Sequence, residues 1–183
     1  MVLIMSIDIG KRNTAISVIT VKNDFVFVQE IYVVEVRSNA INGVLLLRQT
    51  LLNLTSRFNF DNVVYEPQLS AVKGRSNANI LANKFIEAYI LGYFHDLDAG
   101  RLFGLQPKLR CKFISNHMDL TKYVFSNNKH RRNKQLSEYF VNNYLDIIYD
   151  NQASCQLILH CDKLDDIHDS IAQAVVSFER KDI

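Results

Sequence analysis

The sequence contains few residues that interrupt regular structure. Only two prolines and six glycines occur among 183 residues, and tryptophan is absent. This scarcity, together with 48% apolar and 22% charged residues, excludes a disordered or fibrous chain and favours dense secondary structure. The length suits one hydrophobic core, so we expect a single domain over residues 1–183.

Long apolar runs and paired cysteines are missing as well. No apolar stretch approaches the ~20 residues that cross a bilayer, so we expect no membrane association. The apolar segment Met1–Ile7 has no basic n-region and is interrupted by Asp8, which does not fit a signal peptide. Three cysteines are an odd number for a disulfide framework. We therefore expect an intracellular protein with reduced thiols.

The net charge of +2 conceals a strong segregation of charge along the chain. Residues 101–134 carry nine basic side chains against one acidic side chain, a net charge of +8. Residues 135–183 carry three basic and nine acidic side chains, a net charge of −6. A basic stretch of this kind is typical of proteins with a polyanionic partner. The alternative is that these charges form only a solvated surface.

Hydrophobic periodicity predicts alternating strands and helices. Strands are expected over Val2–Ile9, Thr14–Thr20, Phe25–Val36, Asn62–Tyr65 and Arg110–Ser115, the first three as an antiparallel meander. Helices are expected over residues 41–57, 76–95, 133–145 and 166–179. The second helix is apolar around nearly its whole circumference, which indicates burial in the core or at a subunit interface. This order predicts an α/β fold with a mixed sheet flanked by helices.

Four acidic residues stand in otherwise apolar surroundings. Asp8 ends the first strand, Glu66 ends the fourth, and Asp166 and Asp169 are three residues apart on one face of the last helix. Two adjacent parallel strands with a helix packed across them would bring these carboxylates together. Their mutual repulsion would be relieved by Mg²⁺. Two such ions ~3.5–4 Å apart can clamp the attacking and leaving oxygens of a phosphodiester.

Each of these acids also has a purely structural explanation. Asp8 fits a turn cap, and Glu66 fits a buried pair with an arginine. Asp166 and Asp169, with the neighbouring Asp165, fit first-turn acids that complement the helix dipole. It is the joint order and setting of the acids that favour a metal centre.

Three motifs carry a resemblance to a known family. They are I-D-I-G at residues 7–10, Y-E-P-Q at residues 65–68 and D-D-I-H-D-S at residues 165–170. Together they resemble the RuvC-like Holliday junction resolvases of the RNase H superfamily, and within that family most closely the poxvirus resolvases. The resemblance covers essentially the whole chain and implies an RNase H-like mixed sheet flanked by helices.

The resemblance also implies an activity and its ligands. The chain is expected to be a structure-selective endodeoxyribonuclease that resolves four-way and other branched DNA junctions by paired nicking, as a homodimer. Asp8, Glu66, Asp166 and Asp169 correspond to the catalytic acids that bind two Mg²⁺ ions, with Mn²⁺ as a substitute. For a poxvirus enzyme the expected setting is the host cytoplasm, in viral DNA recombination and concatemer processing.

The resemblance also implies basic residues near the scissile phosphate. Resolvases of this kind place lysines between the fifth strand and the next helix, a position that Lys122 fits, with Lys134 at the end of the basic loop. Lysine at such a place stabilises charge on the transferred phosphate, and contact with the DNA backbone alone is the alternative. The residues expected to bind DNA are Lys73, Arg75, Lys129, Arg131, Arg132 and Lys134.

Two other functions and one aromatic pair stay open. An Asp-Ile-Gly strand end also begins the phosphate loop of actin-like and sugar-kinase ATPases. The chain lacks their second glycine-rich motif and the length for two duplicated domains, so no nucleotide cofactor is expected. A non-catalytic junction-binding protein is the second alternative.

Tyr123 and Phe125 fit either stacking on an unpaired base or packing in the core.

Overall fold

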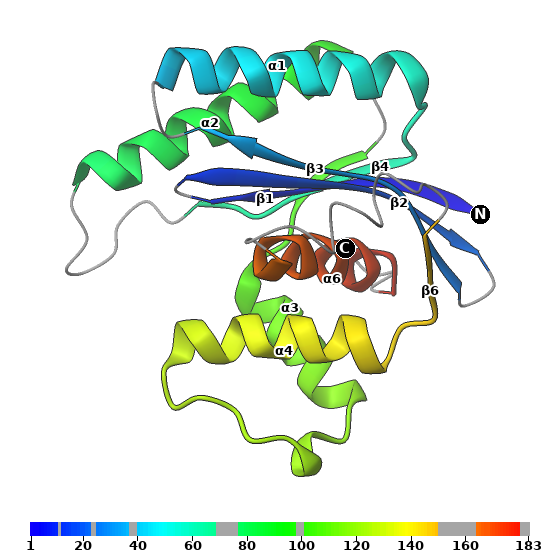
Figure 1. Cartoon of the computed structure of the whole chain (residues 1–183). Helices are drawn as coiled ribbons and strands as arrows, with labels where there is room; N and C mark the ends of the chain where they lie inside the picture. The colour runs from blue at the N-terminus through cyan, green and yellow to red at the C-terminus, as the bar shows by residue number, and fades with distance from the viewer. Residues whose placement is uncertain are drawn as a thin grey trace.

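The computed structural model describes residues 1–10, 12–22, 25–36, 40–68, 77–97, 101–149 and 164–179. The strands are β1 (Val2–Ile9), β2 (Asn13–Lys22), β3 (Phe25–Glu35), β4 (Asn62–Tyr65), β5 (Arg101–Gly104) and β6 (Ile147–Tyr149). The helices are α1 (Ala40–Arg57), α2 (Asn77–Leu97), α3 (Pro107–His117), α4 (Lys129–Asn143) and α6 (Leu164–Glu179), with a 3-10 helix η1 (Leu120–Lys122). One mixed sheet carries helices on both faces (Figure 1), which confirms the expected fold class.

The sheet has the strand order β5-β4-β1-β2-β3-β6. The first three strands form the expected antiparallel meander, and β4 lies parallel to β1 on its other side. The outer strands β5 and β6 also run parallel to their neighbours. Strand β1 is central, and its apolar side chains on both faces are buried, as a covered strand requires.

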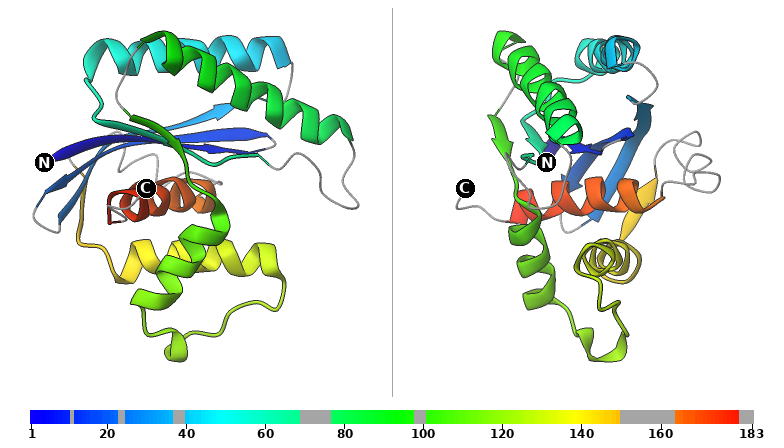
Figure 2. Two further views of the ribbon diagram at one scale, coloured as in Figure 1. Left: turned by 180° about the vertical axis from the view of Figure 1, so that it is seen from behind. Right: turned by 90° about the vertical axis from the view of Figure 1, so that its left-hand side faces the viewer.

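Helices α1 and α2 cover one face of the sheet (Figures 1 and 2). Leu47, Leu51 and Leu54 recur at helical spacing on α1 and pack with Ile90 of α2 against this face. Of the two explanations for the apolar surface of α2, complete burial in the core of the subunit does not hold, because several apolar side chains of its first half face outward. The most exposed is Leu81, at 72%.

Helix α6 lies against the opposite face, between the sheet and α4 (Figure 1). Every residue from 167 to 177 is buried there, because the sheet covers one side of the helix and α3 and α4 cover the other. His168 is among them and is only 5% exposed. Burial lowers the pKa of its imidazole.

The segment after residue 100 differs from the expectation. Residues 110–115 belong to helix α3 and not to a strand, and the strands β5 and β6 were missed. Pro107 occupies the first turn of α3, where its fixed φ and missing N–H are favourable. Gly104 ends β5 beside Pro67, and a Cβ at residue 104 would come within 2.5 Å of the Pro67 ring. The fifth strand can therefore approach the end of β4 only with glycine at this position.

The helices in the described part of the chain are not apolar enough over a sufficient length to span a membrane.

Candidate active site

The two strand-borne acids lie side by side at the same end of the sheet. Strands β1 and β4 pair with Ile7 opposite Tyr65, and the N–H of Glu66 donates to the carbonyl of Ile7 at 3.2 Å. Ile7 and Tyr65 pack on the face covered by α1 and α2. Because successive side chains alternate across a strand, Asp8 and Glu66 face the side on which α6 lies.

Helix α6 is fastened to β1 by buried polar contacts. The hydroxyl of Ser170 donates to the carbonyl of Ser6 at 3.1 Å, and the amide of Gln173 donates to the carbonyl of Ile7 at 3.3 Å. These contacts fix how far α6 is shifted along β1. They thereby place Asp169, which precedes Ser170, near the end of the strand that carries Asp8.

Arg110 of α3 contacts the acids from the side of the sheet on which α6 lies (Figure 1). Its guanidinium lies 2.9 Å from Asp169 Oδ1 and 3.6 Å from Glu66 Oε2, and it donates to the backbone carbonyl of Asp169 at 3.1 Å. Its burial opposes the charge, but Asp169, Glu66 and Asp8 together raise the pKa of Arg110 above its ordinary value. Asp169 Oδ1 has no well-aligned hydrogen bond among the described residues, so the contact is mainly ionic.

Lys134 of α4 reaches the start of α6. Its ammonium lies 2.7 Å from Asp166 Oδ1 and also contacts Asp165. Burial disfavours the charged ammonium, but the hydrogen bonds that it donates to these two carboxylates raise the pKa of Lys134 above its ordinary value. Asp165 is not among the expected metal ligands, yet it shares the Lys134 cation with Asp166, which is one of them.

The strand-borne carboxylates interact strongly. Burial, and then the charges of Glu66 and Asp169, raise the pKa of Asp8 well above its ordinary value. Burial also raises the pKa of Glu66, against the opposing charge of Arg110, and the side chain of Glu66 is hydrogen-bonded to Asp8. Asp8, Glu66 and Asp169 therefore form one electrostatically linked group.

The donors suit a hard divalent cation in their chemistry. All four expected ligands are carboxylates, the oxygen donors that Mg²⁺ prefers. Burial raises the pKa of Asp8 first and the charges of Glu66 and Asp169 second, and a bound cation would offset both effects. In the described part of the chain, however, no three His, Cys, Asp or Glu side chains are arranged to hold one metal ion. The acids are instead gathered around the side chains of Arg110 and Lys134.

Solved structures share this architecture. The RuvC protein of T. thermophilus in complex with a Holliday junction substrate has a TM-score of 0.65 and 15% identity, over 96% of this chain and 92% of that chain. Fowlpox virus resolvase in complex with Holliday junction DNA has a TM-score of 0.60 and 20% identity, over 97% of both chains. The yeast mitochondrial Holliday junction resolvase Ydc2 has a TM-score of 0.62 and 16% identity, over 94% of this chain and 76% of that chain.

The chain has the RuvC-like fold. No protein-family model and no curated protein sequence matches it, so the likeness is carried by structure and, at these identities, establishes the fold. The fowlpox enzyme has the higher sequence identity and the Thermus protein the higher TM-score. A specific relationship to the poxvirus resolvases therefore stays a prediction.

A supporting contact in the RuvC-like fold was not expected from the sequence. Gln68, two residues after Glu66, accepts a hydrogen bond from Asn83 at 2.9 Å, and its N–H donates to Glu87 at 3.3 Å. Both α2 residues are buried, at 8% and 6% exposure, and Lys84 pairs with Glu87 at 2.6 Å. These contacts hold the chain where it leaves β4. The sequence signal that could have indicated these contacts is the presence of Asn83 and Glu87 within an otherwise apolar helix.

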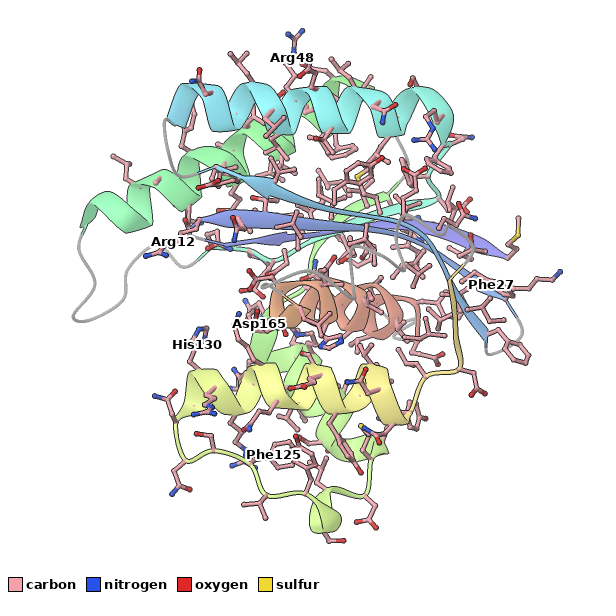
Figure 3. The ribbon with its side chains drawn as sticks, viewed as in Figure 1. Arg12, Phe27, Arg48, Phe125, His130 and Asp165 are labelled. Carbon is pink, nitrogen blue, oxygen red and sulfur yellow. The ribbon has the colours of Figure 1, made fainter. Side chains whose placement is uncertain are left out.

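The expected DNA-binding residues are only partly described. Lys129, Arg131 and Arg132 are exposed in the first turn of α4, which Asn128 caps by accepting hydrogen bonds from two N–H groups. Figure 3 shows His130 of this turn, Asp165 and the exposed Arg12 along one edge of the molecule. Lys73 and Arg75 lie outside the described residues.

The placement of Lys122 needs correction. It was assigned to the position just after the fifth strand, but it lies in η1, after helix α3, and its side chain is outside the description. The cation that follows the true fifth strand and contacts the acids is Arg110. A role of Lys122 in catalysis therefore stays a prediction without its original structural argument.

The aromatic residues before α4 pack against one another. The ring centroids of Tyr123 and Phe125 are 4.7 Å apart, and both rings contact Tyr139 of α4. The guanidinium of Arg132 lies 5.9 Å from the centroid of the Phe125 ring. The core explanation for Tyr123 and Phe125 fits this arrangement. The side chain between them, Val124, is 93% exposed.

Proposed function

We propose that the chain is a divalent-metal-dependent endodeoxyribonuclease that resolves four-way DNA junctions. The observation that carries this proposal is the linked group of Asp8, Glu66 and Asp169 at one end of a RuvC-like sheet. Three chains of this fold bear the names of junction-binding or junction-resolving proteins, and two of them were solved with junction DNA. Acids buried at this position otherwise reduce stability, which favours a functional reason for their presence.

The metal ligands in this proposal are Asp8, Glu66, Asp166 and Asp169, which would hold two Mg²⁺ or Mn²⁺ ions. When bound, the ions supply positive charge that polarises the scissile phosphate and lowers the pKa of water. Lys134 is within contact of Asp166, so its ammonium lies where it can balance charge on the phosphate as well as orient this ligand.

The DNA-binding surface in this proposal begins at the first turn of α4. Lys129, Arg131 and Arg132 are exposed there. Asn128, which caps the helix, is six residues before Lys134, about 9 Å along the helix axis. Phosphates bound to this turn would therefore lie near the acids. Lys73 and Arg75 are proposed to contribute from the segment after β4, and Lys122 stays a candidate for catalysis.

We also propose a homodimer. Leu81 and Phe85 are one helical turn apart on α2 and are 72% and 58% exposed. Large apolar side chains exposed together on a helix favour a protein interface. Two copies related by symmetry would present two identical sites, as the cutting of two opposed strands requires.

The proposed setting is intracellular, in DNA recombination, without a nucleotide cofactor.

The deciding experiment is cleavage of a synthetic four-way junction, with a linear duplex of equal length as control, in Mg²⁺ and in EDTA. The nuclease proposal requires Mg²⁺-dependent cutting of the junction and little cutting of the duplex. Asp8→Asn should abolish cutting while the variant still binds the junction. Junction binding without any cutting by the wild type would instead indicate the non-catalytic binding protein, and ATP binding by calorimetry would revive the ATPase alternative.

A further inference from the structure

Arg110 is the most deeply buried cation of the described residues. Its side chain is 3% exposed, and two of its three nitrogens face the acids. Nη2 lies 2.9 Å from Asp169 Oδ1, while Nη1 lies 3.6 Å from Glu66 Oε2. A guanidinium so enclosed by carboxylates stays charged at every accessible pH.

The backbone holds this guanidinium in place. Nη1 donates to the carbonyl of Asp169 at 3.1 Å, so the side chain contacts the backbone of α6 as well as the carboxylate of Asp169. Ile114, one turn further along α3, is fully buried and anchors that helix in the core. Arg110 therefore cannot swing out to solvent when another cation approaches the acids. It also lies too deep to be the main contact of a DNA phosphate.

We infer that Arg110 is a built-in counter-ion that lowers the affinity of the centre for divalent cations while keeping its acids together before metal binds. This inference rests on the proposed function. The acids are gathered around the guanidinium, and no three of them are arranged to hold one ion. A divalent ion must bind the same carboxylates with Arg110 in place, and like charges repel strongly in a poorly screened interior.

Arg110 can affect metal binding through its charge or by orienting the acids, and these two effects predict opposite changes in metal affinity when Arg110 is replaced by a neutral residue. If the charge dominates, a neutral residue of similar length removes a repulsion and tightens metal binding. If Arg110 only orients the acids, the same replacement loosens metal binding. The inference commits to the first result, since a guanidinium at 2.9 Å from a ligand oxygen acts directly on any ion at that carboxylate.

The test measures Mn²⁺ binding by the whole chain in the absence of DNA, with free Mn²⁺ followed by electron paramagnetic resonance. Arg110→Met should bind Mn²⁺ about tenfold more tightly than the wild type, or more. Arg110→Lys keeps the charge and should stay within about twofold of the wild type. Lys112→Met is the matched control, because Lys112 is an exposed cation on the same helix, and this variant should also match the wild type.

Circular dichroism without metal shows which variants fold, and Arg110→Gln serves as a second neutral variant. Equal or weaker Mn²⁺ binding by the folded neutral variants overturns the inference, and so does Arg110→Lys binding as tightly as Arg110→Met. If neither neutral variant folds, Arg110→Lys decides alone: wild-type affinity supports the inference and tighter binding overturns it. A wild type that binds no Mn²⁺ and cuts no junction would instead refute the proposed function.

Discussion

The hydroxyl of Ser17 on β2 lies 2.7 Å from the hydroxyl of Ser170 on α6, although 153 residues separate them. The hydroxyl of Ser170 donates its one hydrogen to the carbonyl of Ser6, so the hydroxyl of Ser17 must donate to that of Ser170. Both side chains are fully buried. This short chain of hydrogen bonds connects the last helix to two strands, beside the residues that carry the acids.

Ser170→Ala should lower the free energy of unfolding by about 1–3 kcal/mol, because it removes the partner that the buried Ser17 hydroxyl has among the described residues. For a chain of this size, each ~1 kcal/mol lowers Tm by about 2–4 °C in thermal unfolding. Ser177→Ala is the control on the same helix, since the Ser177 hydroxyl donates to the carbonyl of Ala174 within that helix and connects it to no described strand. An equal loss in both variants would contradict the special role of the Ser17–Ser170 contact.

Asp8→Asn should stabilise the metal-free protein at neutral pH, by about 0.5–2 kcal/mol. Burial and the neighbouring Glu66 and Asp169 raise the pKa of Asp8 in the folded state, so the folded protein loses stability as pH rises above the pKa of the unfolded chain. Asparagine carries no such charge. The gain in Tm in EDTA should therefore be larger at pH 7.5 than at pH 5, and a loss at pH 7.5 would refute the prediction.

Much of the fold could be predicted from local pattern. The limits of β1 and β4 were predicted correctly because β-branched runs end there in polar residues, and Asp8 and Glu66 stand at those ends. The meander followed from strands joined by short turns. These features depend on neighbours in the sequence, so a single sequence contains the information.

The cations of the centre could not be predicted in this way. The sequence predicts a strand at Arg110, but the burial of this residue depends on Glu66 and Asp169, which lie 44 and 59 residues away. Nothing in the local pattern distinguishes it from the exposed Lys112. Strand β5 was missed because Arg101–Gly104 is short and contains a charged and a glycine residue, and its pairing comes from β4.

Lys134→Met should lower the rate of junction cleavage by about 10²-fold or more, because it removes a cation that contacts Asp166 at 2.7 Å and lies near the proposed phosphate site. Junction affinity should fall by much less, since only one of several cations is lost. Single-turnover cleavage with saturating enzyme separates the two effects. Arg48→Met, on the opposite face of the sheet in Figure 3, should leave both quantities unchanged.

Leu81→Asp combined with Phe85→Asp should convert the dimer into a monomer, because charges replace two exposed apolar side chains on α2. Sedimentation equilibrium measures the mass, and circular dichroism should show an unchanged fold. Leu45→Asp is the matched control: Leu45 is 53% exposed but lies on α1. A monomeric wild type, or dissociation by Leu45→Asp as well, would contradict the assignment of the interface to α2.

Arg131 and Arg132, both exposed at the start of α4, should bind phosphates without reading sequence. Each phosphate contact contributes about 0.9 to the slope of log Kobs against log salt concentration on duplex DNA. Replacing both by alanine should therefore reduce the slope by about 2 and weaken binding similarly for junctions of different sequence. Fluorescence anisotropy from 50 to 200 mM salt measures the slope, with Arg48→Ala as the control on the far face. An unchanged slope in the double variant would show that DNA does not contact this turn, and Arg131 and Arg132 would then belong to a solvated surface.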